Sequence, residues 1–368
     1  MIDFSPEHTT EDIDYFLSPK AIRDRAKKLF ELASSGGTHF EVRLDRLDTI
    51  AEYVKDVTLV AYPELDIPYH SRWGHFLAGN RSRLSILDDK LAHLSKEDRV
   101  RAKLDLVVIS VLLDAGAGAD WVFRDKDIHG DVLSIGRSEG LAIASLYLFL
   151  GGAFSSDVSN PYRVDAEGLR SLTLETLASG FQVSVDNPLV GLEGRLQLLH
   201  SLGDALESLP GYFGSQTARP GGLWDFLTLK GTRANFTAME LLDSVLRGLG
   251  SIWPGRLSLS GVPLGDVWRH STLGGLNSLD CLVPFHKLSQ WLSYSMIEPF
   301  EEAGCTVTRL DGLTGLAEYR NGGLLVDMGL LKLRDSAVLN RFHSPSSDLI
   351  VEWRALTLHT LDLLAPRV

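Results

Sequence analysis

The chain has 368 residues, of which 44% are hydrophobic and 23% charged, so it can bury a large globular core. Its formal net charge of −12 argues against binding to nucleic acid or to an anionic membrane, because both need clustered Lys and Arg. Two cysteines, Cys281 and Cys305, require no disulfide framework and indicate a reducing compartment. Residues 1–16 are acidic and lack the pattern of a signal peptide, so we expect a cytoplasmic protein.

Apolar residues at helical spacing predict helices along the first part of the chain. Ser18-Pro19 is a typical helix start, and Gly36-Gly37 is a typical stop. Further helices are expected over residues 47–57, 100–113 and 141–150. The last of these belongs to the most apolar run, which is too short to cross a membrane.

Residues 62–80 break this periodicity and are rich in side chains typical of a binding site. The candidates are Tyr69, His70, Arg72, Trp73 and His75. Aromatic rings beside cationic and imidazole groups are typical of a pocket wall, although a well-packed surface loop explains the composition equally well. Together with Asp66, the two histidines match no zinc-binding spacing, so we expect no metal.

The second part of the chain is also predicted to be mainly helical. Asn187-Pro188 marks a helix start, and residues 209–214 form a Pro-Gly turn similar to the hairpin of helix-hairpin-helix DNA glycosylases, a common turn elsewhere too. Residues 219–226 lead into a further expected helix through Leu241, Leu242 and Leu246, and another helix is expected over 351–361, with a few short strands near 304–333. We therefore expect one compact, mainly α domain over residues 1–368, with lobes at 1–208 and 209–368.

The strongest candidates for chemistry lie between residues 283 and 329. A helix over 285–298 has Lys287 and Trp291 beside its buried stripe, and Gly304 ends it. Glu318 follows in Glu-Tyr-Arg-Asn-Gly-Gly, where the paired glycines predict a tight turn. A lysine at a helix edge and a carboxylate at such a turn suit a small polar pocket. Alternatively, Glu318 and Arg320 only brace the turn by hydrogen bonds.

Several other chemistries lack their sequence signatures. Residues 114–120 (DAGAGAD) lack the glycine spacing of a dinucleotide-binding loop and follow a helix rather than a strand. No Gly-x-Ser-x-Gly motif follows a strand, so no serine-hydrolase triad is indicated. We expect no cofactor.

Two motifs in the 283–329 stretch carry a family resemblance. Pro284-Phe-His-Lys-Leu-Ser-Gln-Trp-Leu and Asp311-Gly-Leu-Thr-Gly-Leu-Ala-Glu-Tyr-Arg-Asn-Gly-Gly, with segments 62–76, 115–124 and 219–227, resemble a family of unknown-function proteins of the uracil-catabolism (URC) pathway. The resemblance covers nearly the whole chain. It implies a hydrolase, an N-glycosidase that cleaves the bond between ribose and urea in ribosylurea, expected as its 5-phosphate.

The same motifs are similar, more distantly, to segments of queuosine-nucleotide glycohydrolases, whose helical fold is like that of DNA glycosylases. This resemblance implies that Glu318 takes the place of a catalytic aspartate, with a side chain one methylene longer, and that Lys287 matches the neighbouring lysine. Glu318 then activates water or stabilises an oxocarbenium-like transition state, and Lys287 orients Glu318 or holds substrate oxygens. The expected substrate-binding residues are Arg320, His70, Arg72, Trp73, His75, Tyr69, Trp291 and Asp311.

Two rival functions remain open at this point. An amidohydrolase acting on a ureido acid from the opened uracil ring would yield ammonia or carbamate rather than a free sugar. A non-catalytic nucleotide-binding partner of the ring-opening enzyme would be stabilised by ligand without turnover. The acidic charge disfavours a DNA glycosylase, and the expected partner is a small ribosyl or nucleotide-derived molecule.

Overall fold

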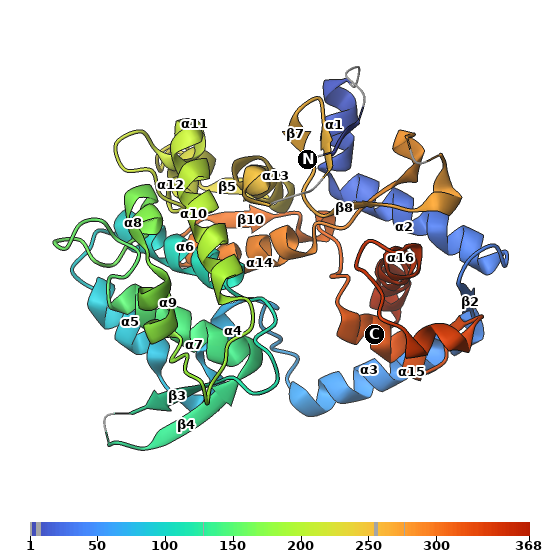
Figure 1. Cartoon of the computed structure of the whole chain (residues 1–368), viewed down its shortest axis with the longest axis horizontal. Helices are drawn as coiled ribbons and strands as arrows, with labels where there is room; N and C mark the ends of the chain where they lie inside the picture. Colours follow the sequence, from blue (N-terminus) through green and yellow to red (C-terminus); the bar gives the residue numbers. More distant parts are fainter. Residues whose placement is uncertain (1, 5–8, 128, 254–256, 276) are drawn as a thin grey trace. The chain divides into compact units, whose positions relative to one another are not determined.

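Contacts along the chain separate two compact sets of segments in the computed structural model. Unit 1 comprises Met1–Pro68, Pro254–Gln290 and Arg309–Val368, and unit 2 comprises Tyr69–Trp253 and Trp291–Thr308. The structure describes residues 2–4, 9–127, 129–253, 257–275 and 277–368. Helices dominate both units and the strands are short, which confirms the mainly α prediction (Figure 1).

The unit boundaries differ from the lobes expected at 1–208 and 209–368. Each unit joins segments that are distant in sequence, and local periodicity carries no information about such contacts. One helix, α14 (Lys287–Glu302), begins in unit 1 and continues into unit 2. That residues 1–368 form a single domain stays a prediction.

Unit 1 is built around two long helices and several short strands. Its helices are α1 (Thr10–Phe16), α2 (Pro19–Ser34), α3 (Leu47–Ala61), α15 (Tyr319–Asp327) and α16 (Asp348–Leu364). Its strands are β1 (Ile2–Phe4), β2 (Phe40–Val42), β6 (Leu257–Leu259), β7 (Val262–Pro263), β8 (Val267–Arg269), β9 (Leu282–Pro284) and β11 (Leu331–Leu333). The strands pair as β1-β6-β7, β2-β11 and β8-β9.

Local sequence signals explain how the central helices of unit 1 begin and pack. The Ser18 hydroxyl accepts a hydrogen bond from the Ala21 N–H, which caps α2 as predicted, and Pro19 occupies its first position. The apolar stripe of α2 then packs against α16 in two buried clusters. Phe285, just before α14, belongs to one of these clusters, so the chain that leads to Lys287 is anchored in the core.

Unit 2 consists mostly of short helices around two buried ones. Its helices are α4 (Trp73–Phe76), α5 (Arg83–Leu91), α6 (Lys96–Leu112), α7 (Arg137–Leu150), α8 (Ala166–Ser171), α9 (Leu174–Gly180), α10 (Leu192–Ser208), α11 (Pro210–Phe213), α12 (Gly222–Leu227) and α13 (Ala238–Leu249). Its strands are β3 (Val122–Lys126), β4 (Val132–Gly136), β5 (Asn235–Thr237) and β10 (Thr306–Thr308). β3 and β4 form an antiparallel hairpin, and β5 pairs with β10.

The core of unit 2 explains why two predicted helices are so apolar. α6 and α7, which the sequence predicts as buried helices, have almost no exposed residues beyond their first turns. Phe300 of α14 stacks on Trp224 and meets Phe236 edge-on, and all three rings are buried. The second half of α14 is therefore part of the core of unit 2.

In unit 2 one further predicted helix is confirmed, and the predicted start of another is wrong. The helix expected through Leu241, Leu242 and Leu246 is α13, which a capping box of Thr237 and Glu240 begins. The start expected at Asn187 falls instead at Leu192, since the Asn187 amide bonds both backbone groups of Val122 in β3. Helical periodicity was correct at both places, and side-chain bonding to the backbone decided the boundaries.

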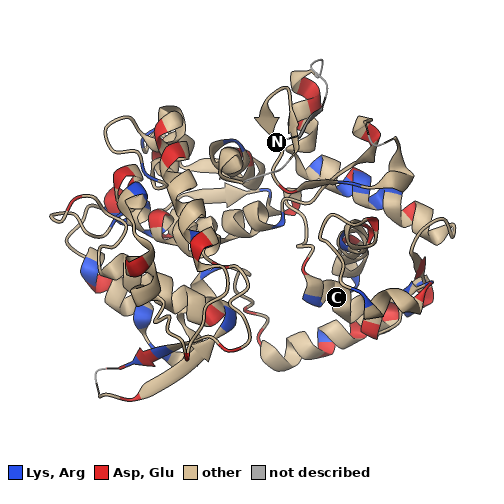
Figure 2. Ribbon diagram, in the orientation of Figure 1, with Lys and Arg blue, Asp and Glu red and all other residues tan. Residues whose placement is uncertain are grey.

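Charges of both signs are spread along the helices of each unit (Figure 2). The two cysteines are buried. Within the described ranges, no helix is long and apolar enough to span a membrane.

Candidate functional site

The two residues proposed for catalysis meet in unit 1. Lys287 is the first residue of α14 and Glu318 immediately precedes α15, so the ends of two helices bring them together. The Lys287 Nζ atom forms an ion pair with Oε1 of Glu318, and the two side chains are 29% and 30% exposed. This confirms the prediction that they pair. Because both remain accessible to water, the carboxylate can be reached by a solute.

Asp266 fixes the backbone at which α14 begins. Its Oδ2 atom accepts the Lys287 N–H at 3.1 Å and Arg354 Nη2 at 2.7 Å, while Oδ1 accepts Arg354 Nη1 at 3.0 Å and the Trp268 indole N–H at 2.6 Å. Burial alone would raise the pKa of Asp266, but the Arg354 guanidinium and these hydrogen bonds hold it far below its usual range. Asp266 is therefore ionised beside the first turn of α14.

Gln290 connects the same turn of α14 to the segment that carries Glu318. The buried Gln290 amide accepts the Thr314 N–H at 2.8 Å and donates to Thr314 Oγ1 at 2.7 Å and to the Phe285 carbonyl at 3.2 Å. From Thr314 the chain reaches Glu318, whose N–H donates to the Leu316 carbonyl at 2.8 Å. The spacing of Lys287 and Glu318 thus depends on buried hydrogen bonds on both sides.

His286, next to Lys287, has an unusual conformation. Its φ of 48° is in the left-handed region that residues other than glycine rarely occupy. The ring is fully buried and its Nε2 atom contacts the Phe16 carbonyl at 2.7 Å. Burial lowers the pKa of His286, so the ring is held neutral at the start of the helix.

The tight turn expected at Gly322-Gly323 is wrong, because both glycines lie inside α15. A Cβ atom on Gly322 would lie 2.6 Å from Trp353 Nε1 and 2.8 Å from Thr357 Oγ1, whereas one on Gly323 would meet nothing within 4 Å. Gly322 therefore permits close packing of α15 on α16. Glu318 is presented by a helix N-terminus instead of by a turn.

The other two predicted residues of unit 1 are on its surface. The Asp311 side chain is 81% exposed and its carboxylate faces Arg309 at 3.8 Å. Arg320, in the first turn of α15, is also exposed. Their expected contact with substrate stays a prediction.

The remaining predicted residues belong to unit 2, where three of them surround Trp291. The centre of the Trp291 ring lies 6.3 Å from that of His70, 5.7 Å from that of His75 and 5.6 Å from the Arg72 guanidinium. Trp73 instead donates its indole N–H to the Ser295 carbonyl. Tyr69 donates its hydroxyl to Glu301 at 3.1 Å.

Arg72 is fully buried, and its guanidinium connects segments of unit 2 by hydrogen bonds. It donates to Ser110 Oγ at 2.7 Å, to Asp114 Oδ2 at 3.0 Å and to the Ser138 carbonyl at 3.2 Å. Burial lowers the pKa of Arg72 to about 10, although Asp114 opposes the shift. Burial and the Arg72 charge also lower the pKa of His75. These contacts hold Arg72 and the start of α4 in the packed interior of unit 2, and whether the residues around them bind substrate stays a prediction.

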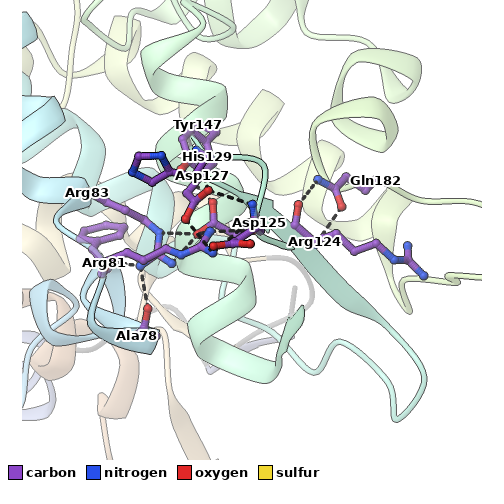
Figure 3. Close-up of polar contacts among 11 residues, drawn as sticks. Ala78, Arg81, Arg83, Arg124, Asp125, Asp127, His129, Tyr147 and Gln182 are labelled. Atoms are coloured by element: carbon purple, nitrogen blue, oxygen red, sulfur yellow. Dashed lines mark hydrogen bonds and ion pairs between the residues drawn. The ribbon is translucent and has the colours of Figure 1, made fainter. Parts of the chain in front are cut away.

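A second buried charge cluster in unit 2 was not anticipated (Figure 3). The Asp125 carboxylate accepts hydrogen bonds from Arg83 at 2.6 Å, Arg81 at 2.9 Å and the Tyr147 hydroxyl at 2.8 Å. Arg83 also donates to the Phe76 and Ala78 carbonyls. The cluster links the start of α5 to β3 and α7, and its saturated hydrogen bonding indicates a structural role.

Comparison with known proteins places the chain in one family. Residues 15–368 match the family model described as "Protein of unknown function (DUF1688)". The chain belongs to the DUF1688 family. It is 38% identical to "Uracil catabolism protein 4" of Lachancea kluyveri, an alignment that covers 97% of this chain and 88% of that protein. It is 41% identical to "Protein urg3" of Schizosaccharomyces pombe, with 97% and 86% covered. The resemblance to queuosine-nucleotide glycohydrolases is supported by neither and stays a prediction.

In this DUF1688 protein the chemistry available at the Lys287–Glu318 pair is proton transfer and charge stabilisation. An ionised carboxylate beside an ammonium can polarise water or stabilise a cation that forms on a substrate. No group of three or more His, Cys, Asp or Glu residues that could hold a metal ion occurs among the residues that the structure describes.

Sequence reasoning missed three residues that support this pair, namely Asp266, Gln290 and Arg354. Gln290 lies in the first quoted motif, so its closeness to Lys287 was predictable. Its hydrogen bonds to Thr314, in the second motif, were not. Asp266 and Arg354 are 88 positions apart, and no spacing rule joins them. The sequence signal beside Asp266 is the glycine that precedes it. Gly265 has a φ of 67°, a conformation that glycine adopts readily, and it turns the chain just before Asp266.

Proposed function

We propose that this protein is an N-glycoside hydrolase of uracil catabolism that converts ribosylurea, as its 5-phosphate, to urea and ribose 5-phosphate. The water-accessible pairing of Lys287 with Glu318 is the observation that carries the proposal. The name of the Lachancea kluyveri relative supports the pathway, since the two chains align over nearly their whole lengths.

In the proposed reaction the bond between C1′ of the ribose and a urea nitrogen breaks as positive charge develops on the sugar. The ionised Glu318 carboxylate stabilises this charge and accepts a proton from the attacking water, whose oxygen ends on C1′. The departing nitrogen takes a proton from the Lys287 ammonium. Glu318 returns its proton to Lys287 through their contact, so the water is divided between the two products.

The direct test is incubation of the purified protein with ribosylurea and, separately, with ribosylurea 5-phosphate. We expect urea and the free sugar or sugar phosphate in equal amounts, with the phosphate preferred. Heat-treated protein provides the control for spontaneous hydrolysis. Absence of urea from both substrates would overturn the proposal.

The same assay separates the two rival functions. Release of ammonia from a ureido acid, with no sugar product, would favour an amidohydrolase. A rise in melting temperature with nucleotide, without any turnover, would favour a binding partner of the ring-opening enzyme.

A further inference from the structure

The start of α14 is unusually constrained for a helix end. Three features there cost free energy of folding. They are the left-handed backbone of His286, the burial of its ring, and the mostly buried charges of Asp266 and Arg354. Strain and buried charge of this kind persist only where the surrounding structure holds them, and they gather at functional sites. Here they surround Lys287: His286 precedes it in the chain, and Asp266, which is paired with Arg354, accepts its N–H.

The hydrogen bonds of Asp266 leave no spare acceptor capacity among its described partners. Each carboxylate oxygen accepts one Arg354 nitrogen, and each accepts a second donor: Trp268 Nε1 on Oδ1 and the Lys287 N–H on Oδ2. The Asp266 carbonyl also accepts the Phe285 N–H at 2.9 Å. Asp266 therefore holds both the chain entering α14 and its first helical residue.

An amide at this position could not reproduce these bonds. The NH2 group of an asparagine would face one Arg354 nitrogen and a second donor, which is the Lys287 N–H in one orientation of the amide and the Trp268 indole N–H in the other. The paired bonds from Arg354 would therefore be broken in both orientations. The Lys287 N–H is the donor whose release would move α14. A shift of its first turn carries the Lys287 ammonium away from Glu318.

We infer that Asp266 is a positioning residue, which fixes the first turn of α14 so that the Lys287 ammonium meets the Glu318 carboxylate. Arg354 has the supporting role of keeping Asp266 ionised and oriented. The kinetic consequence rests on the proposed function, whereas the geometric consequence does not.

The geometric test is a zero-length cross-link between the two side chains. A water-soluble carbodiimide converts the Glu318 carboxylate to an O-acylisourea. Lys287 Nζ then attacks the acyl carbon, and the carbodiimide leaves as its substituted urea. The isopeptide bond that remains joins two tryptic peptides, which mass spectrometry detects. We expect the joined peptides in the wild type and a yield roughly tenfold lower in Asp266→Asn, because the reaction depends on proximity. The control is Ile50→Ala, which loosens the core of unit 1 without touching α14.

Asp266→Glu keeps the charge but displaces the acceptor from the Lys287 N–H, so it provides a second variant if Asp266→Asn does not fold. It is expected to fold and also to give a low yield. A wild-type yield in a folded Asp266 variant would overturn the inference, and so would failure of both variants to fold, since that would make Asp266 purely structural.

The kinetic arm separates this inference from the proposed function. In a folded Asp266→Asn protein we expect kcat to fall about 100-fold with KM little changed, since misplacement by about an ångström costs that much. A rise in KM with kcat unchanged would contradict a positioning role for Asp266. If the wild type releases no urea, the proposed function fails while the cross-link result still decides the role of Asp266.

Discussion

Two ion pairs in this protein have the same chemistry and opposite surroundings. In unit 1 the Lys287 and Glu318 side chains are 29% and 30% exposed, whereas in unit 2 those of Arg72 and Asp114 are 0% and 10% exposed. A partly exposed pair contributes little to stability but can be reached by a substrate, and a buried pair contributes mainly by filling and bracing the interior. The contrast suggests that the first pair is kept for chemistry and the second for structure.

The largest expected effect comes from breaking the exposed pair. Lys287→Met should lower urea release from ribosylurea 5-phosphate by roughly 10²–10⁴-fold, the range typical of a lost proton-transfer group. Its melting temperature should change little, because the pair is partly exposed. Lys332→Met in β11, also an exposed lysine, is the control. An unchanged rate would place the chemistry elsewhere.

Breaking the buried pair should have the reverse outcome. Arg72→Met leaves the mostly buried Asp114 without its cation, so we expect a loss of about 3–5 kcal/mol in the free energy of unfolding. Denaturant titration measures this loss, with Arg367→Met at the exposed Asp48 pair as the control that should change far less. A variant of wild-type stability that no longer binds substrate would reverse the comparison and make Arg72 a binding residue.

The support of Glu318 can be tested with a matched pair of glycines in α15. Gly322→Ala should destabilise the protein by about 1–3 kcal/mol, since its methyl group overlaps Trp353 and Thr357. Gly323→Ala meets open space and should stabilise the helix by roughly 0.5–1 kcal/mol. Thermal or denaturant unfolding of the two variants decides the matter. Equal effects would mean that α15 does not pack closely on α16.

The smallest expected effect concerns pH and His75 of α4, which lies close to Arg72. Because burial and Arg72 lower the pKa of His75, the folded state favours the neutral ring. The stability that depends on the neutral His75 ring is therefore fully present above the unfolded pKa of about 6.5. It is lost as pH falls through that value toward the lower pKa of the folded state. His75→Gln should reduce the drop in melting temperature between about pH 7.5 and about 5.5. His129→Gln, at an exposed ring, should not, and equal pH profiles for both would refute this account.

The sequence predicted what depends on neighbours along the chain. Ser18-Pro19 defined the start of α2, and the apolar runs defined α6 and α7, because caps and periodicity are local. The meeting of Lys287 and Glu318 was expected chiefly from the family resemblance, since spacing alone left a simple braced turn open. Gly322 misled because a glycine serves close packing as well as turns, and its partner Trp353 lies on another helix. Asp266 was invisible for the same reason, since its partner Arg354 is remote in sequence.

The most direct test of the central claim is the rate of urea release by Glu318→Gln on ribosylurea 5-phosphate. The amide keeps the size of the side chain and removes its charge, so the fold should persist, as judged by circular dichroism and melting. We predict that this folded variant releases no urea above the spontaneous rate. Wild-type turnover by it would contradict the assignment of Glu318 as the reacting carboxylate.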